Sequence, residues 1–170
     1  MRSVVFWGLL LLLIGLWAFS DALFPPEIVT SPKALVRDGD TLILGEQTIR
    51  LHGMDAPEYA QTCKDATGKD WPCGKAARAQ LSALVLPGSI VCEPKAQDKY
   101  NRKVAKCASA TVADLSESMV QAGLAISPSE RGTAPYAEAE ASAKSAKRGI
   151  WQGVFETPET YRDRAATRGD

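Results

Sequence analysis

Residues 36–58, VRDGDTLILGEQTIRLHGMDAPE, decide the fold. Two strand-like runs, Thr41–Leu44 and Gln47–Gly53, flank the dipeptide Gly45-Glu46. A glycine at the first of two loop residues is typical of a tight β-hairpin. In the second run apolar and polar side chains alternate, so one face of the strand is expected in the core and the other at the surface. This strand ends at Gly53, immediately before a segment that carries carboxylates.

The rest of the chain adds helices and a second pair of strands. Apolar residues recur at helical spacing over Gly74–Leu86, and Pro87-Gly88 ends that helix. A capping-box sequence at Asp114–Glu117 opens a second helix, and Pro135 opens a third, which Gly149 ends. Two strand-like runs that each contain a cysteine lie between the first and second helices. A further short run lies at Lys33–Arg37. Five short strands and three helices predict an α+β domain built on a five-stranded OB-fold β-barrel.

The N-terminal segment 1–22 differs from everything after it. An unbroken apolar run, Val4–Phe19, follows Arg2. It is interpreted as either a signal peptide or a transmembrane anchor. Both place the rest of the chain outside the cytoplasm, in a periplasmic, secreted or membrane-anchored form, because Arg2 stays inside. The remainder divides into a Pro-rich linker, the OB domain and a polar C-terminal tail expected on the surface, at residues 23–32, 33–152 and 153–170.

Charge and histidine content exclude several classes of protein. Lys and Arg number 20, and Asp and Glu also number 20, so the chain is not a strongly basic nucleic-acid coat protein. A local basic cleft remains compatible with this balance. A single histidine, His52, argues against a His-rich metal site and against a serine or cysteine triad, and we interpret it as structural.

The four cysteines predict disulfides in an exported chain, with three possible connectivities. A zinc site is disfavoured because no pair has the C-x-x-C spacing. Cys92 and Cys107 are equidistant from the turn between their strands, so a regular hairpin places them opposite each other at disulfide distance. The predicted bonds are therefore Cys92–Cys107 and Cys63–Cys73.

Acidic and basic side chains gather at one predicted rim of the barrel. Asp40 precedes the first strand of the hairpin, and Asp55 and Glu58 follow its second strand. Crowded carboxylates repel unless a cation joins them, and oxygen ligands suit a hard ion such as Ca²⁺ or Mg²⁺. Arg50, on the second strand, and Arg102, in the turn between the cysteine strands, can bind a phosphate. A cation, arginines and a spare carboxylate are the parts that phosphodiester hydrolysis needs.

The sequence resembles one known family. VRDGDT, IRLHGMDAPE, DKYNR, DLSESMVQAGLA and the pattern A-K-x-x-x-x-G-I-W occur in the order seen in staphylococcal-nuclease-like (thermonuclease) domains. The resemblance covers Lys33 to Trp151. It implies an OB barrel with three helices, Ca²⁺ as cofactor, and cleavage of DNA and RNA at the 5′-oxygen to leave 3′-phosphates.

The resemblance also assigns roles to single residues. It places the Ca²⁺ ligands at Asp40, Asp55 and the backbone carbonyl of Ala56. It places the phosphate-binding arginines and the general-base candidate at Arg50, Arg102 and Glu58. It places contacts with the nucleotide at Lys99 and Tyr100. The family's glycine in the DKYNR segment is replaced by Asn101, the non-glycine residue best suited to a left-handed turn.

Three hypotheses remain open from the sequence. The first is a Ca²⁺-dependent, extracytoplasmic nuclease that acts as a monomer on DNA or RNA, with membrane contact if the N-terminal segment is uncleaved. The second is a non-catalytic OB-fold module that binds nucleic acid or oligosaccharide at the envelope; the neutral charge of the exported part favours it, because nonspecific binding to nucleic acid depends on cationic contacts. The third is a membrane-tethered accessory protein of envelope or polysaccharide assembly.

Overall fold

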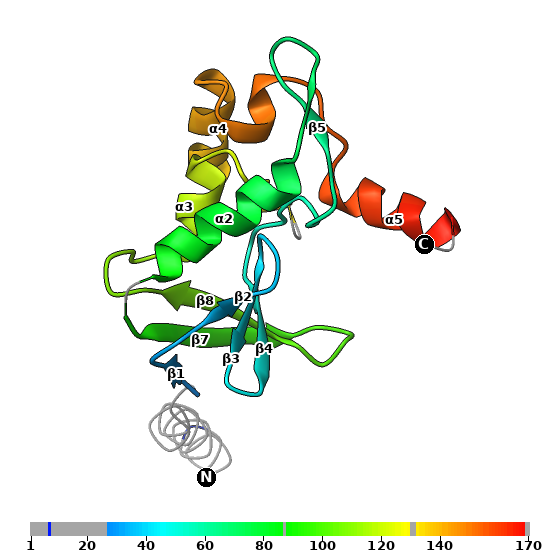
Figure 1. Ribbon diagram of the computed structural model, residues 1–170. Coiled ribbons are helices and arrows are strands. Elements are labelled where there is room, and N and C mark those ends of the chain that lie inside the picture. The colour runs from blue at the N-terminus through cyan, green and yellow to red at the C-terminus, as the bar shows by residue number, and fades with distance from the viewer. Residues whose placement is uncertain (1–6, 8–26, 87, 130–131, 169–170) are drawn as a thin grey trace.

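The computed structural model describes Trp7 and residues 27–86, 88–129 and 132–168. The predicted signal or anchor segment, 1–22, lies outside these residues apart from Trp7. Among the described residues, no helix is both long enough and apolar enough to cross a membrane. The described chain is a mixed α+β structure, as the sequence predicts (Figure 1).

One mixed sheet organises the domain. Its six strands lie in the order β1-β7-β8-β4-β3-β2, and only the β4–β8 pair is parallel. The predicted hairpin is present: Leu44 pairs with Gln47, and Gly45 takes a positive φ of 61° that a side chain would strain. The strands are β1 (Val29–Ser31), β2 (Leu35–Val36), β3 (Thr41–Leu44), β4 (Gln47–Leu51), β7 (Ile90–Gln97) and β8 (Lys103–Ala108).

The sheet differs from the predicted five-stranded OB-fold β-barrel. It has six strands, and within the described chain the two edge strands, β1 and β2, do not pair with each other. These edges are only three and two residues long. Pro32 lies between them and has no N–H to donate to a ladder, which helps to keep the edges short. β1 itself lies within the segment 23–32 expected as a linker.

Four α-helices and one 3₁₀ helix complete the described fold. α2 (Cys73–Val85), α3 (Leu115–Gln121) and α4 (Ala137–Ser145) correspond to the three predicted helices. Asp114 caps α3 as its sequence indicates, because its carboxylate accepts hydrogen bonds from the backbone N–H of Ser116 and Glu117. The 3₁₀ helix η1 (Gly149–Gln152) and the helix α5 (Pro158–Arg168) were not predicted. In Figure 1, α2, α3 and α4 gather beside the sheet, and α5 stands apart from them.

Both predicted disulfides form, each in a different apolar cluster. Cys92 and Cys107 are register partners on β7 and β8 within the main core, with Cα atoms 4.1 Å apart. The second bond, Cys63–Cys73, joins the short hairpin of β5 (Cys63–Lys64) and β6 (Asp70–Trp71) to the start of α2. Around it lies a smaller cluster that also contains Ile150, Trp71, Ile126, Trp151 and Phe155. The first disulfide therefore cross-links two strands of the sheet. The second stabilises the small apolar cluster against which the C-terminal segment packs.

Candidate active site

Backbone pairing brings Asp40 and Asp55 to one rim of the sheet. Leu51 N–H donates to the carbonyl of Asp40 over 2.8 Å, so the residue before β3 lies at the end of β4. The N–H and C=O of Asp55 both bond to Ile126, at 2.9 Å each, which fixes the loop after β4 against the segment after α3. Both carboxylates are buried, with side chains 7% exposed.

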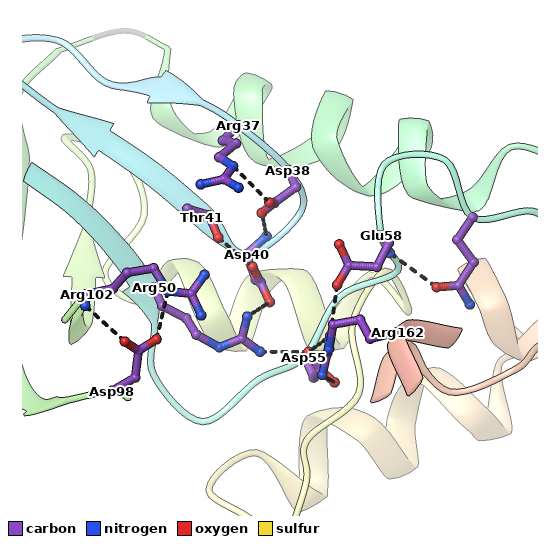
Figure 2. Close-up of polar contacts among 11 residues, drawn as sticks. Arg37, Asp38, Asp40, Thr41, Arg50, Asp55, Glu58, Asp98, Arg102 and Arg162 are labelled. Carbon is purple, nitrogen blue, oxygen red and sulfur yellow. Dashed lines mark hydrogen bonds and ion pairs between the residues drawn. The ribbon is translucent and has the colours of Figure 1, made fainter. Parts of the chain in front are cut away.

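Arg50 bridges the two carboxylates. One terminal nitrogen of its guanidinium is paired with Asp40, and the other, Nη2, donates to Oδ1 of Asp55 over 2.7 Å (Figure 2). Burial, the largest influence, raises the pKa of Asp40 to about 7, although the charge of Arg50 acts in the opposite direction. Burial also lowers the pKa of Arg50, but Asp40 and Asp55 outweigh it and the pKa is raised overall. Two buried carboxylates thus converge on one cationic group.

This donor set fits a hard cation. The oxygens of Asp40 and Asp55 already meet at one planar guanidinium, so a single ion could contact both. Within the described residues, no group of three or more His, Cys, Asp or Glu side chains could hold a metal by itself. Backbone carbonyls and water would have to supply the remaining ligands, which Ca²⁺ accepts readily, and Ala56 is buried beside Asp55 on the same loop.

Glu58 lies next to Asp55, on the same loop. Its backbone N–H donates to Oε1 of the buried Gln61 over 3.1 Å, which orders the loop around it. Its carboxylate lies near that of Asp55, and both carboxylates accept a hydrogen bond from Arg162 (Figure 2). The structure therefore brings together Asp40, Arg50, Asp55 and Glu58.

Arg102 reaches the same face from the neighbouring strand. In the parallel pairing of β4 with β8, Arg50 is the partner of Val104, so Arg102, two residues earlier, shares the face of Arg50. Its Nε donates to Asp98 over 2.7 Å, and Asp98 also accepts from the backbone N–H of Arg102. Figure 2 shows its guanidinium extending toward the rim.

Lys99 and Tyr100 occupy the exposed turn that leads into Arg102. The Tyr100 side chain is 68% exposed. The ammonium of Lys99 lies 5.1 Å from its ring centroid and the guanidinium carbon of Arg102 lies 5.6 Å from it. Asn101 takes φ 65°, the left-handed conformation expected for the residue that replaces glycine. The turn thus presents an aromatic face and two cations next to the rim.

One residue of the site was missed from the sequence. Arg162, on α5, forms a fork with Asp55, Nη1 to Oδ1 at 2.9 Å and Nη2 to Oδ2 at 3.0 Å. Its Nη1 also donates to Oε1 of Glu58 over 2.9 Å. A helix signal was present, because Thr157 followed by Pro158 is a common N-cap and first-turn pair, and Thr157 Oγ1 does accept from Thr160 N–H. Nothing local to α5 indicates which part of the surface it meets.

The fold and the rim together define a mixed α+β domain of the staphylococcal nuclease type. The family model described as Staphylococcal nuclease homologue matches residues 48–153, which is more than half of the chain. The chain belongs to this family. Asp40 lies before the matched span, and α5 with Arg162 lies after it.

Three curated relatives show how far this likeness extends. Succinoglycan biosynthesis protein ExoI of Rhizobium meliloti (strain 1021) is 34% identical over 121 residues, covering 71% of this chain and 63% of the relative. Probable endonuclease LCL3 of Schizophyllum commune is 34% identical over 147 residues, covering 75% and 49%. Probable endonuclease LCL3 of Verticillium alfalfae is 29% identical over 143 residues, covering 76% and 48%. The chain thus spans from about half to under two-thirds of the length of these relatives.

Proposed function

We propose that this protein is a Ca²⁺-dependent nuclease that hydrolyses phosphodiester bonds of DNA or RNA outside the cytoplasm and leaves 3′-phosphates. The observation that carries the proposal is the convergence of the buried Asp40 and Asp55 on Arg50, beside Glu58 and on the face of Arg102. Membership of the nuclease family supports it, as do two relatives named probable endonuclease. The same membership supports an OB-like relationship of the strands.

The proposed metal site uses groups that already face one another. Asp40, Asp55 and the carbonyl of Ala56 would hold Ca²⁺, with water completing its ligands. The bound ion supplies positive charge that stabilises the pentacovalent transition state at phosphorus. Arg50, which now pairs with both carboxylates, would be free to bind the phosphate oxygens through its N–H groups when those carboxylates hold the ion.

The remaining residues supply proton transfer and substrate contacts. Glu58 takes a proton from the attacking water, whose oxygen bonds to phosphorus as the bond from phosphorus to the 5′-oxygen breaks. The 5′-oxygen departs with a proton from solvent, and the phosphate stays on the 3′-oxygen. Arg102, oriented through its Nε by Asp98, binds the charge that develops on the phosphate. Lys99 and Tyr100 bind the flanking nucleotide, by charge and by stacking.

An extracytoplasmic location is part of the proposal. Both disulfides support it, because such bonds persist in oxidising compartments. The apolar run Val4–Phe19 supports it as a signal peptide or an anchor. We also propose that the protein is a monomer and that the nuclease domain lies at 33–152, with β1 adding an edge strand to its sheet.

Cleavage by the full 170-residue chain tests the proposal directly. The chain, kept in solution with a mild detergent, is incubated with single-stranded DNA or RNA in Ca²⁺, in Mg²⁺ or in chelator. We expect cleavage in Ca²⁺, poor cleavage in Mg²⁺, and none in chelator, because a loose site of two carboxylates suits the larger ion. The product ends should carry 3′-phosphates. Equal activity in chelator would contradict the metal ligands, and absence of cleavage in every condition would contradict the enzyme.

A second candidate function is a non-catalytic module that binds nucleic acid or oligosaccharide at the envelope. The relative named succinoglycan biosynthesis protein favours it, as does the pairing of the rim carboxylates with arginines. The same preparation is titrated with an acidic polysaccharide and with uncleavable phosphorothioate DNA. Tight polysaccharide binding together with no nucleolysis would favour this candidate.

A further inference from the structure

We propose that Arg162 is a third arginine of the active site, one that occupies Asp55 and Glu58 until Ca²⁺ displaces it and so sets the affinity for the ion. This inference rests on the proposed function, since it takes Asp55 as a Ca²⁺ ligand.

The contacts of Arg162 place it on the groups that the ion needs. Its two terminal nitrogens meet both oxygens of Asp55, at 2.9 and 3.0 Å. Oδ1 of Asp55 also accepts from Arg50 over 2.7 Å, so the two arginines together engage both oxygens of the proposed ligand. The bond from Arg162 to Glu58 adds the proposed base to the same pair. Figure 2 shows Arg162 between Asp55 and Glu58, on the side of the rim opposite Arg50 and Arg102.

The ion pairs of Arg162 alter the net charge that a cation would meet at the rim. Asp40, Asp55 and Glu58 contribute three carboxylates, and Arg50 alone would leave a strongly negative site that attracts a divalent cation. Arg162 adds a second guanidinium at ion-pair distance and removes much of that attraction. A cation that binds Asp55 must therefore replace an existing pair, whose charge-assisted bonds are lost.

Contacts of residues 153–156 hold the start of α5 beside the rim. Lys64 N–H donates to the carbonyl of Val154 over 2.8 Å, and Nε2 of Gln61 donates to the carbonyl of Glu156 over 2.7 Å. The ring of Phe155 packs edge-on against Trp151, with centroids 4.9 Å apart, in the cluster around Cys63–Cys73. At Gly153 any Cβ would collide with the carbonyls of Lys64 and Asp65, so that segment is held closely against the β5 hairpin. The tail is thus anchored before α5 begins.

The exposure of Arg162 lets it act as a removable partner. Its side chain is 40% exposed, whereas those of Asp40 and Asp55 are 7% exposed. The arginine can therefore swing into solvent without opening the core, while the anchored segment keeps it beside the rim. α5 also lies outside the span that matches the family model, so this arginine is a feature of the chain beyond the matched domain.

Ca²⁺ titration by isothermal calorimetry tests the proposal on the full chain in mild detergent. Arg162→Gln removes the charge, and Arg162→Lys retains it without the fork. Arg164→Gln, the control, removes a charge two residues further along α5, where Arg164 pairs with Glu156. We expect Arg162→Gln to bind Ca²⁺ at least about tenfold more tightly, Arg162→Lys to lie between it and the unaltered chain, and Arg164→Gln to change by less than about twofold.

The outcomes separate this inference from the proposed function. An unchanged or weaker Ca²⁺ affinity in Arg162→Gln overturns the displacement, and so does a complete lack of Ca²⁺ binding in every variant. Cleavage of single-stranded DNA is measured on the same preparations. Nucleolysis by the unaltered chain with no shift in Arg162→Gln removes only the inference, whereas a tenfold shift with no nucleolysis removes only the enzyme.

Discussion

Two regions of the molecule reach the same rim by different routes. The β3–β4 hairpin and the loop to Glu58 deliver Asp40, Arg50 and Asp55 through strand register and local pairing. The segment from Trp151 to α5 delivers Arg162 from the far end of the chain, through a small apolar cluster and two hydrogen bonds. The first region packs in the main core, and the second packs against the small apolar cluster around Cys63–Cys73. The residues proposed for catalysis and the arginine proposed to control Ca²⁺ binding therefore come from separate parts of one chain.

The largest effect is expected at Arg50 and Arg102, the two arginines proposed to bind the phosphate. Arg50→Lys and Arg102→Lys should each lower kcat at least about a hundredfold, because a point charge cannot replace a planar fork on the transition state. Single-turnover cleavage measures this, with the melting temperature as a check on folding. Arg37→Lys is the matched control, since Arg37 is exposed and pairs only weakly with its neighbour Asp38. Near-native turnover in either variant would mean that the arginine is structural and would contradict its proposed role in catalysis.

Removal of one carboxylate charge from the rim is expected to abolish Ca²⁺ binding. Asp40→Asn keeps the shape of the side chain and the oxygen that accepts from Thr41 Oγ1, at 2.8 Å, so the fold should remain. The ion loses one of only two buried carboxylate ligands. Calorimetry should show no Ca²⁺ binding, and circular dichroism should match the unaltered chain. A melted variant would mean that Asp40 is a structural turn residue.

The site residues of the β3–β4 hairpin and the loop after it could be predicted from the sequence, whereas Arg162 in the C-terminal segment could not. Gly45, the alternation in Gln47–Leu51 and the spacing of the carboxylates are local signals, and the register follows from them. The course of the tail depends on where Phe155 finds an apolar partner and where Lys64 and Gln61 find carbonyls, all of them distant in sequence. A polar helix such as α5, with no apolar stripe, carries no signal of what it will face.

For a related reason, the sequence could not predict that the two edges of the sheet stay unpaired with each other in the described chain. Strand runs can be read from β-branched and apolar residues, but closure depends on pairing between the two edges of the sheet. The residues of β1 and β2 are few and lie around Pro32. From the sequence, the residues of β1 were expected to lie in a linker, and only those of β2 lay in a strand-like run, so the relation between the two edges could not be predicted.

The two disulfides offer a direct test of the division between the regions. Paired Cys→Ala replacement at Cys92 and Cys107 should lower the free energy of unfolding by about 3 kcal/mol, as expected for a loop of this length. Paired replacement at Cys63 and Cys73 should cost somewhat less, because the loop is shorter, but it should also release α5 and tighten Ca²⁺ binding as Arg162→Gln does. Urea denaturation and calorimetry measure both quantities. An equal rise in Ca²⁺ affinity in the two double variants would show that the tail does not depend on its own disulfide.

The smallest expected effect falls on Gln61, a side chain that contacts both regions. Gln61 is buried, with Oε1 accepting from Glu58 N–H and Nε2 donating to the carbonyl of Glu156. Gln61→Ala leaves both partners without that bond and should cost about 1–3 kcal/mol of stability. Because one amide serves both the loop of Glu58 and the approach to α5, the variant should also increase proteolysis within residues 153–168. Gln152→Ala is the control, since that amide donates to the carbonyl of Gly149, within η1. Limited proteolysis followed by mass mapping locates the first cuts. Increased cleavage after Gln152→Ala, or unchanged cleavage after Gln61→Ala, would contradict a tail held to the site through Gln61, and would leave the apolar cluster around Cys63–Cys73 as its anchor.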